Sequence, residues 1–206
     1  DWHKAHATVS KDGWALLCMP AHLRDDVEIV QAAVKKAGGA LEFASGRLQA
    51  NRDLALVAVT QDGMVLRLLP KALRADRDIV LAAVASKGWS LEYASEELRA
   101  DREVVMLAVS QNAWALEYAS EDLKADTEVV MAAVSLSGWA LKHAAATLQS
   151  DAAFLQEVAE KIAPDGLVFK VTMLSGRFCP YIHHRSFVNA TSQTVLEYCA
   201  RRLDLS

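Results

Sequence analysis

Hydrophobic and polar residues recur along the chain with a period of 25 residues. One hydrophobic position holds leucine in six consecutive copies: Leu16, Leu41, Leu66, Leu91, Leu116 and Leu141. A second position is also leucine throughout: Leu23, Leu48, Leu73, Leu98, Leu123 and Leu148. A third position holds residues that cap helices: Asp26, Asn51, Asp76, Asp101, Asp126 and Asp151. Six copies without an insertion indicate six copies of one structural unit stacked in a row.

The second half of each copy has the pattern of a short capped helix. In the third copy, Asp76 precedes an apolar pattern from Ile79 to Val84 that falls on one side of a helix. An aspartate at the N-cap accepts hydrogen bonds from free amides of the first turn. We expect the helix to end about ten residues later at a glycine in the left-handed conformation. This position holds Gly13, Gly38, Gly63, Gly88, Ala113 and Gly138. At the alanine we expect a strained or frayed corner.

The first half of each copy supports two interpretations. Trp89, Leu91 and Tyr93 alternate with polar residues, which is the period of a strand. Trp89 and Tyr93 are also four residues apart, and a helix between neighbouring layers can be apolar nearly all round. We therefore expect a short helix, a turn carrying the second leucine, and the capped helix. This is a mainly α, αα-solenoid of six helix–turn–helix repeats over about residues 10–160, with residues 1–9 as a partial first repeat. A strand–helix solenoid is the alternative.

The tryptophan position is expected to lie inside the array. It holds Trp14, Gly39, Met64, Trp89, Trp114 and Trp139. Large apolar rings at one position of a solenoid fill its core more often than they bind a ligand. Gly39 and Met64 make this row thin in the middle copies, where the sequence leaves room for a groove. His143 stands where Tyr93 and Tyr118 stand in sister copies, so we interpret it as a core substitution rather than a catalytic base.

The repeated pattern W-A-L-E-Y-A-S-E-x-L-x-x-D-x-E-V-V-x-A-A-V resembles an uncharacterised repeat family of protists and bacteria, described as a domain of unknown function. The resemblance covers roughly residues 1–160 and is strongest over residues 85–134. It implies a repeat architecture and no chemistry, because this family has no established activity or catalytic residues. Helices this short are not stable alone, so each must bury one side against its neighbours in the array.

The composition changes after residue 163. Residues 167–173 and 178–184 are strand-like around a glycine-containing turn at 174–177, and residues 194–203 have a helical pattern. This ββα order resembles the opening half of a ubiquitin-like β-grasp domain. We therefore divide the chain into a helical-repeat solenoid, residues 1–163, and a ββα C-terminal segment, residues 164–206. The second part is either a truncated ubiquitin-like domain or a cap on the open end of the solenoid.

The ends and the cysteines say little about the compartment. The chain begins without methionine, so we expect that a leader or an earlier domain has been removed before Asp1. No apolar run approaches the ~18 residues that a membrane-spanning helix needs, so no transmembrane segment is expected. Cys18, Cys179 and Cys199 are too scattered for a disulfide framework, which favours a reducing, intracellular compartment. The sequence does not define the compartment further.

The usual arrangements of catalytic residues are missing from the sequence. It contains no glycine-rich phosphate loop and no G-x-S-x-G elbow, and its acids fall mainly at the periodic positions. His183 and His184 with Cys179 give a hint of a metal site. However, adjacent side chains on a strand point to opposite faces, and a zinc site takes four ligands. We therefore expect no enzyme activity, no metal and no cofactor.

Basic residues occupy two periodic positions, and both are candidates for binding a partner. The six candidate residues are Arg52, Arg74, Arg77, Arg99, Arg102 and Lys124. Arginine favours interfaces and binds carboxylates through paired hydrogen bonds. The net charge is −4, and Asp78, Glu103 and Glu128 flank the arginines, so an acidic protein surface fits better than nucleic acid. The alternative is a solvated surface with ion pairs that are each worth little.

Two classes of function remain. The first is a non-catalytic protein–protein interaction or scaffold subunit that presents an extended solenoid surface to a partner protein or a multi-subunit assembly. The second is an accessory segment of a larger enzyme or signalling protein whose catalytic domain lies outside these residues. They differ in whether the transcript continues into a recognisable catalytic domain. Nucleic-acid binding is the least favoured class.

Overall fold

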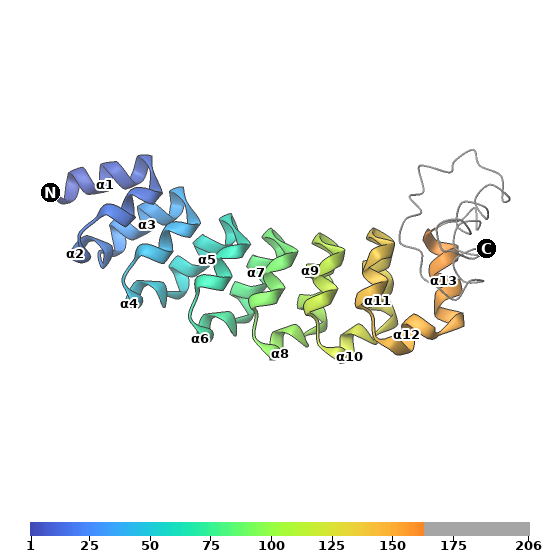
Figure 1. Cartoon of the computed structure of the whole chain (residues 1–206). Coiled ribbons are helices and arrows are strands. Elements are labelled where there is room, and N and C mark those ends of the chain that lie inside the picture. The colour runs from blue at the N-terminus through green and yellow to red at the C-terminus, as the bar shows by residue number, and fades with distance from the viewer. Residues whose placement is uncertain (163–206) are drawn as a thin grey trace, which may run out of the picture.

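Each 25-residue unit folds into three helical elements: a six-residue 3-10 helix, an α-helix of four or five residues, and an α-helix of ten or eleven residues (Figure 1). The computed structural model describes residues 1–162, and this part of the chain contains no strand. The mainly α repeat solenoid is therefore confirmed, and the strand–helix alternative is wrong. The expected ββα segment, residues 164–206, lies outside the described residues.

Counted from the first residue of each 3-10 helix, the six units span residues 13–37, 38–62, 63–87, 88–112, 113–137 and 138–162. The 3-10 helices are η1 (Gly13–Cys18), η2 (Gly38–Phe43), η3 (Gly63–Leu68), η4 (Gly88–Tyr93), η5 (Ala113–Tyr118) and η6 (Gly138–His143). The short helices are α2 (Ala21–Arg24), α4 (Gly46–Gln49), α6 (Lys71–Arg74), α8 (Glu96–Arg99), α10 (Glu121–Lys124) and α12 (Ala146–Ser150). The long helices are α3 (Val27–Lys36), α5 (Arg52–Gln61), α7 (Arg77–Ser86), α9 (Arg102–Gln111), α11 (Thr127–Leu136) and α13 (Ala152–Ile162). The partial first repeat is the single helix α1 (Trp2–Lys11).

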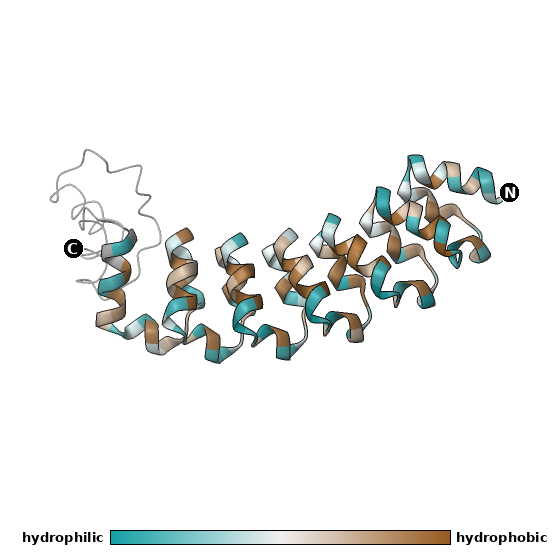
Figure 2. Cartoon of the chain, turned by 180° about the vertical axis from the view of Figure 1, so that it is seen from behind, coloured by the Kyte–Doolittle hydropathy of each residue, from teal (hydrophilic) through white to brown (hydrophobic). Residues whose placement is uncertain are grey.

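The six units stack side by side in a bowed array (Figure 1). The short helices follow its convex edge, and α1 and α13 lie at opposite ends. Long helices of neighbouring units contact one another, as do neighbouring 3-10 helices. Figure 2 shows that the long helices carry both hydrophobic and hydrophilic residues along their length. Each unit therefore buries its apolar side mainly against the units before and after it, as solenoid repeats do.

The long helices begin at the capping residues that the sequence predicted. In the fourth unit, Oδ1 of Asp101 accepts hydrogen bonds from the amides of Glu103 at 2.9 Å and Val104 at 3.1 Å. Asn51 caps α5 in the same way and accepts from the amide of Leu54 at 3.1 Å. Four apolar positions of α7 are fully buried, which agrees with the expected helical face. Capping and a buried face together explain why such short helices form.

The first half of each unit is a helix, as expected, but of the 3-10 type. In η4, Leu91 is buried, whereas Trp89 and Glu92 are exposed. A 3-10 helix has three residues per turn, so residues three apart lie on the same side. The expectation that the tryptophans fill the interior is therefore wrong. The exposed fraction is 52% for Trp14, 38% for Trp89 and 39% for Trp139.

The glycine that opens the 3-10 helix allows close contact with the long helix of the same unit. A Cβ built on Gly88 would lie 2.4 Å from the carbonyl oxygen of Ala108 in α9. The same kind of contact occurs at Gly13, Gly38 and Gly63. No glycine in residues 1–162 has a left-handed backbone, so the expected left-handed cap is wrong; α7 ends at Lys87 in an extended conformation. Ala113 is buried and opens a 3-10 helix of the usual length, so the expected fraying there is not observed.

A backbone hydrogen bond joins neighbouring units at the start of the short helix. The amide of Ser95 donates to the carbonyl oxygen of Arg74 at 3.0 Å, and that of Ser120 donates to Arg99 at 2.9 Å. Two further bonds of this kind run from Ser45 to Arg24 and from Ala145 to Lys124, both at 2.8 Å. Pro70 has no amide hydrogen, so the junction between the second and third units lacks this bond.

Candidate functional site

Three of the six predicted partner-binding residues form ion pairs between units. Arg77 of the third unit donates from Nε to Asp101 of the fourth unit at 3.0 Å and from Nη2 to Glu103. Two other arginines make equivalent contacts with the following unit. The complete set, which we call the arginine ladder, is Arg52 with Asp76 and Asp78, Arg77 with Asp101 and Glu103, and Arg102 with Asp126 and Glu128. Each arginine thus connects one unit to the capped helix of the next.

Both sides of the arginine ladder favour their charged forms. The hydrogen bond from Arg52 lowers the pKa of Asp76 below its usual range, against the opposing effect of partial burial, and backbone amides of α7 add to this. The backbone amide of Val129 makes the largest contribution to the lowered pKa of Asp126, and Arg102 lowers it further. Hydrogen bonds from Arg52 to Asp76 and Asp78 raise the pKa of its guanidinium. A partner's carboxylate would have to compete with these groups.

The position of the ladder arginines is filled differently in the first units. The indole Nε1 of Trp2 donates to Oδ2 of Asp26 at 3.1 Å, which reproduces the contact of an arginine with the next capping residue. Val27 has no donor group, and the capping residue that follows is the uncharged Asn51. The ladder therefore begins only at Arg52.

The other three predicted residues, Arg74, Arg99 and Lys124, lie at the ends of short helices and are partly buried. The side chains of Arg99 and Lys124 are 34% and 18% exposed, and each lies near a glutamate three residues earlier. Nε of Arg74 and of Arg99 is buried without a hydrogen-bond partner. At the same position, Gln49 and Gln149 donate to carbonyl oxygens of their own unit. The structure thus divides the six residues into two sets with different contacts.

A surface that the sequence interpretation missed is formed by the outward side of the 3-10 helices, and we call it the aromatic face. Its first row is Trp14, Gly39, Met64, Trp89, Trp114 and Trp139. Three residues later is a largely charged row of Leu17, Glu42, Arg67, Glu92, Glu117 and Lys142. Four residues later is a row of Cys18, Phe43, Leu68, Tyr93, Tyr118 and His143. The signal that could have located this face is the charged residue three positions after the tryptophan.

Rings of the aromatic face contact each other between units. The ring centroids of Trp14 and Phe43 are 6.1 Å apart, those of Trp89 and Tyr118 are 5.9 Å apart, and those of Trp114 and His143 are 5.5 Å apart, all with an edge-on geometry. Nζ of Lys142 lies 4.3 Å from the ring centroid of Trp114, which is a cation–π contact. Burial lowers the pKa of His143, which favours its neutral imidazole, and the ring packs edge-on against Trp114. His143 thus takes the place of the tyrosine in sister units, but it is half-buried on the outward side and not a core residue as expected.

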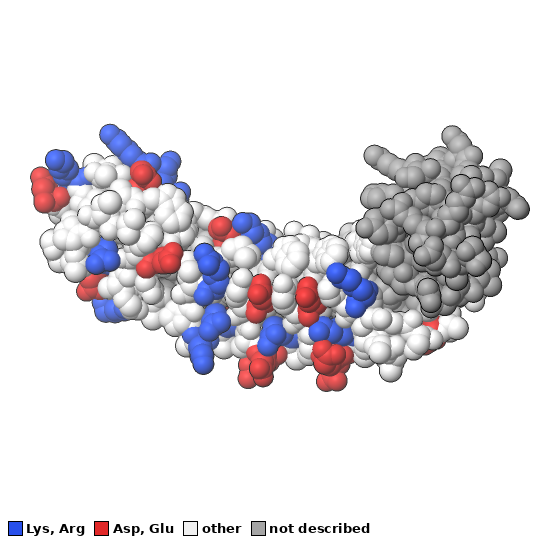
Figure 3. Space-filling view, viewed as in Figure 1, with Lys and Arg blue, Asp and Glu red and all other residues white. Residues whose placement is uncertain are grey.

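Two carboxylates, Glu92 and Glu117, act on the tyrosines in the middle of the aromatic face. Burial raises the pKa of Tyr118, and the charges of Glu92 and Glu117 raise it further. A hydrogen bond with Glu92 raises the pKa of Tyr93. On the side shown in Figure 3, Lys and Arg are interspersed with Asp and Glu along the array.

Where glycine and methionine replace tryptophan, a groove of about 310 Å³ interrupts the aromatic face. Trp14, Gly39, Glu42, Met64 and Arg67 contribute to its lining. A Cβ on Gly39 would lie 2.7 Å from Cη2 of Trp14, so the glycine provides room for the indole of the preceding unit. The groove lies at the place where the sequence, with Gly39 and Met64 in the tryptophan row, left room for a groove.

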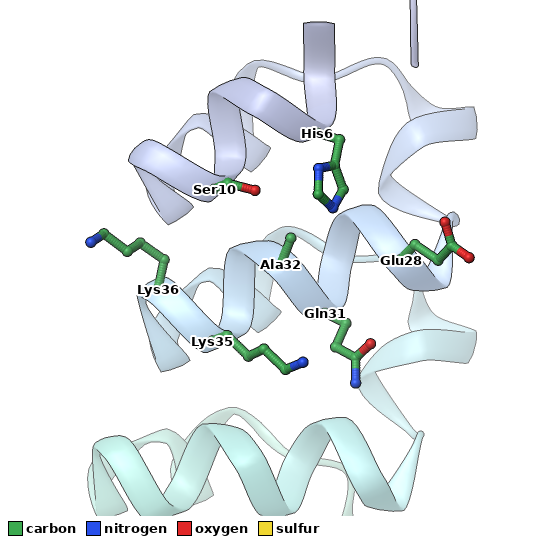
Figure 4. A pocket seen from close by; sticks show the side chains of 7 residues that line it. All are labelled: His6, Ser10, Glu28, Gln31, Ala32, Lys35 and Lys36. Carbon is green, nitrogen blue, oxygen red and sulfur yellow. The ribbon is translucent and has the colours of Figure 1, made fainter. Parts of the chain in front are cut away.

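A second hollow, of about 540 Å³, lies between α1 and α3 (Figure 4). It is lined by His6, Ser10, Glu28, Gln31, Ala32, Lys35 and Lys36. Figure 4 shows the carboxylate of Glu28 and the amine of Lys36 at opposite ends, so the charged groups do not converge on one point. In residues 1–162, no group of three or more His, Cys, Asp or Glu side chains is arranged to hold a metal ion. The aromatic face is therefore the stronger candidate site.

Helices and exposed rings repeated in register define a helical-repeat protein of the solenoid class. A family model described as "Domain of unknown function (DUF4116)" matches residues 7–49, 51–99 and 101–149, and the chain belongs to this family. Each match covers about two units, and the expected resemblance to an uncharacterised repeat family is confirmed. No curated protein and no solved structure matches the chain. Every helix in the described part is too short or too polar to span a lipid bilayer.

Proposed function

We propose that this chain is a non-catalytic protein-interaction module whose aromatic face binds a partner protein. The observation that carries this proposal is the exposure of large apolar side chains in one periodic surface. The exposed fraction is 52% for Trp14, 58% for Leu17, 38% for Trp89 and 39% for Trp139. Side chains of this size are usually withdrawn from water, and exposed apolar patches commonly mark interaction sites.

The aromatic face also has properties that favour binding energy. Tryptophan and tyrosine are enriched among the residues that dominate protein interfaces, because they bury a large area and lose few rotamers. Here the rings of Trp89 and Tyr118 already contact each other across a unit boundary. Little further ordering is therefore needed when a partner covers them, which lowers the entropic cost of association.

The competing proposal is an acidic partner that binds the two basic rows. One row is Arg52, Arg77 and Arg102 of the arginine ladder, and the other is Arg74, Arg99 and Lys124 of the short helices. At Arg77, a carboxylate of such a partner would replace Asp101 or Glu103, both of which already contact the guanidinium. The exchange brings little net gain, because one exposed ion pair is lost for each that forms. A partner that packs on the exposed rings of Trp14 or Trp89 displaces no ion pair of the described residues, so we favour the aromatic face.

The test is a comparison of variants of the full chain used as bait in cells that express the protein. Trp14→Ser combined with Trp89→Ser should abolish retention of the partner. Leu136→Ser is the matched control, since Leu136 is 60% exposed on α11, outside the aromatic face, and it should leave retention unchanged. Thermal melts of each variant show whether it is folded. A partner that is retained by the double variant but lost with Arg77→Glu overturns the proposal and favours the basic rows.

A further inference from the structure

One part of the aromatic face combines an exposed indole with two carboxylates. Trp89 is 38% exposed, and Tyr118 of the next unit packs edge-on against it. Glu92 follows Trp89 by three residues in η4, so the geometry of the 3-10 helix places both on the outward side. Glu117 occupies the equivalent position in η5, and both carboxylates act on the pKa of Tyr118. Neither glutamate forms an ion pair within residues 1–162.

The neighbouring unit shows what this arrangement accommodates. Trp114 has the same place in the fifth unit that Trp89 has in the fourth, and Lys142 of the sixth unit lies over its ring at 4.3 Å. The residue that corresponds to Lys142 for Trp89 is Glu117. The chain thus supplies a cation to the indole of Trp114 and a carboxylate beside the indole of Trp89. In residues 1–162, no Lys or Arg lies over the ring of Trp89 as Lys142 lies over that of Trp114.

We infer that Trp89, Tyr118, Glu92 and Glu117 form a site for one lysine or arginine side chain of the partner protein. This inference rests on the proposed function and names the chemistry of the partner. The ring face attracts a cation through its quadrupole, and the two carboxylates add charge-assisted hydrogen bonds. Arginine suits the site best, because its planar guanidinium stacks on an aromatic ring while its edge donates to carboxylates.

The structure also limits what can lie beside this cation. Neighbouring helices in such arrays are about 8–10 Å apart, and an extended segment advances about 3.3 Å per residue. A residue three positions from the bound cation would therefore lie near Trp114 and Lys142. A second cation there would be repelled by Lys142. The segment of the partner that fits this surface therefore carries a single basic residue. The residue three positions away from it, in the direction of Lys142, is neutral or acidic.

The first experiment uses the full chain labelled with ¹⁵N and follows its indole N–H signals by NMR. The chain has five tryptophans, and single Trp→Phe variants assign the five signals. The probe is a seven-residue Gly-Ser peptide with a central arginine, acetylated and amidated to remove the terminal charges. The signal of Trp89 should shift saturably with this peptide. The signal of Trp2, whose indole is bonded to Asp26, should not move, and a peptide with a central glutamate should have no effect.

Variants of the carboxylates separate a specific site from general attraction of charge. Glu92→Gln with Glu117→Gln should weaken binding of the arginine peptide at least tenfold. Asp53→Asn with Asp122→Asn makes the same change in net charge at exposed acids outside the aromatic face and should leave affinity within twofold. Glu117→Lys should abolish binding, because its ammonium would occupy Trp89 as Lys142 occupies Trp114.

The inference is overturned if the Trp89 signal does not respond to the arginine peptide. It is also overturned if the two double variants lose affinity equally, since the effect would then be one of net charge alone. The pull-down with the tryptophan variants tests the proposed function separately, so a failure of the inference can be told from a failure of the proposed function. Suppose that the variant with Trp14→Ser and Trp89→Ser loses the partner, while the Trp89 signal does not respond to the arginine peptide. The proposed function then stands, and the inference of a bound lysine or arginine fails. A partner retained by that variant rejects the face itself.

Discussion

Nε of Arg77 lies 3.0 Å from Oδ2 of Asp101, while Oδ1 of the same aspartate caps the first turn of α9. One carboxylate therefore serves two purposes: it satisfies amides of its own helix, and it holds the guanidinium of the preceding unit. Loss of the arginine affects the junction between units, and loss of the aspartate affects both the junction and the helix start.

Removing Arg77 should destabilise the array. We expect Arg77→Gln to lower the midpoint of urea unfolding only slightly, since Arg77 and its partner Glu103 are exposed to solvent. Arg77→Glu should cost more, because it places a third carboxylate beside Asp101 and Glu103. Lys71→Gln, which removes a charge from an exposed residue outside the described ion pairs, is the control. Urea titration measures each change, and an unchanged midpoint for Arg77→Glu would show that the ladder is only solvated surface.

The stability of the array should fall in acid. The pKa values of Asp76, Asp101 and Asp126 are below the usual range, although partial burial works against this at Asp101. The native state therefore binds protons less readily than the unfolded state, in which aspartate titrates near ~3.9. Their contribution is complete above that value and disappears as the pH falls through the lower native pKa values. Unfolding midpoints measured from pH 7 to pH 2 should decrease most steeply below about pH 4.

The variant Asp101→Asn provides the check on this assignment. It keeps an amide oxygen that can cap α9 but removes the titrating carboxylate, so its stability should depend less on pH than that of the parent chain. An identical pH dependence in the two proteins would assign the acid sensitivity to other groups.

A methyl group at Gly88 should be costly. Its Cβ would lie 2.4 Å from the carbonyl oxygen of Ala108, so η4 and α9 of the fourth unit must move apart. We expect Gly88→Ala to cost about 1–3 kcal/mol, as other overpacked sites do. Gly138 has the same position in the last unit, and a Cβ there would meet nothing within 4 Å. Gly138→Ala should therefore stabilise the chain by about 0.4–1 kcal/mol through the unfolded state. Equal effects at the two glycines in denaturant titrations would contradict this explanation.

The arginine ladder can be extended by one step. Val27 is 45% exposed at the position of the ladder arginines, and Asn51 and Asp53 occupy the places of their two acidic partners. Val27→Arg combined with Asn51→Asp should raise the free energy of unfolding by about 0.5–1 kcal/mol. A double-mutant cycle is the measurement, because it isolates the coupling between the two new charges. A coupling energy of zero would show that the first long helices are not aligned as the later ones are.

The repeat number, the capping residues and the buried leucines could be predicted from the sequence, because each depends on local chemistry that recurs every 25 residues. Asp101 illustrates this: an acid before an apolar run predicts a helix start, and the structure contains that start. The periodicity also located the position of η4. A six-residue segment, however, is too short to separate a 3-10 helix from a strand by alternation alone.

The outward position of Trp89 was not predicted, because the sequence alone did not identify η4 as a 3-10 helix. In a strand or an α-helix the ring could face the core, whereas three residues per turn place it beside Glu92 on the outside. The role of Gly88 was missed for a different reason. A glycine after a helix commonly adopts the left-handed conformation, and only the folded structure shows that this one is needed for the close approach of η4 to Ala108 in α9. The packing of one helix against another is information that the periodicity of the sequence does not contain.

Pro70 has a mechanical consequence for the molecule. The junction between the second and third units lacks the backbone hydrogen bond found at the equivalent place in the other four, and Gly39 supplies no ring to contact the third unit. Arg52 still ties the two units together through Asp76 and Asp78. This junction is therefore held by the packing of α5 against α7 and by side-chain ion pairs, without the backbone link of the other four. If the array bends, we expect it to bend there first, which would change the separation of Trp14 and Trp89 on the aromatic face.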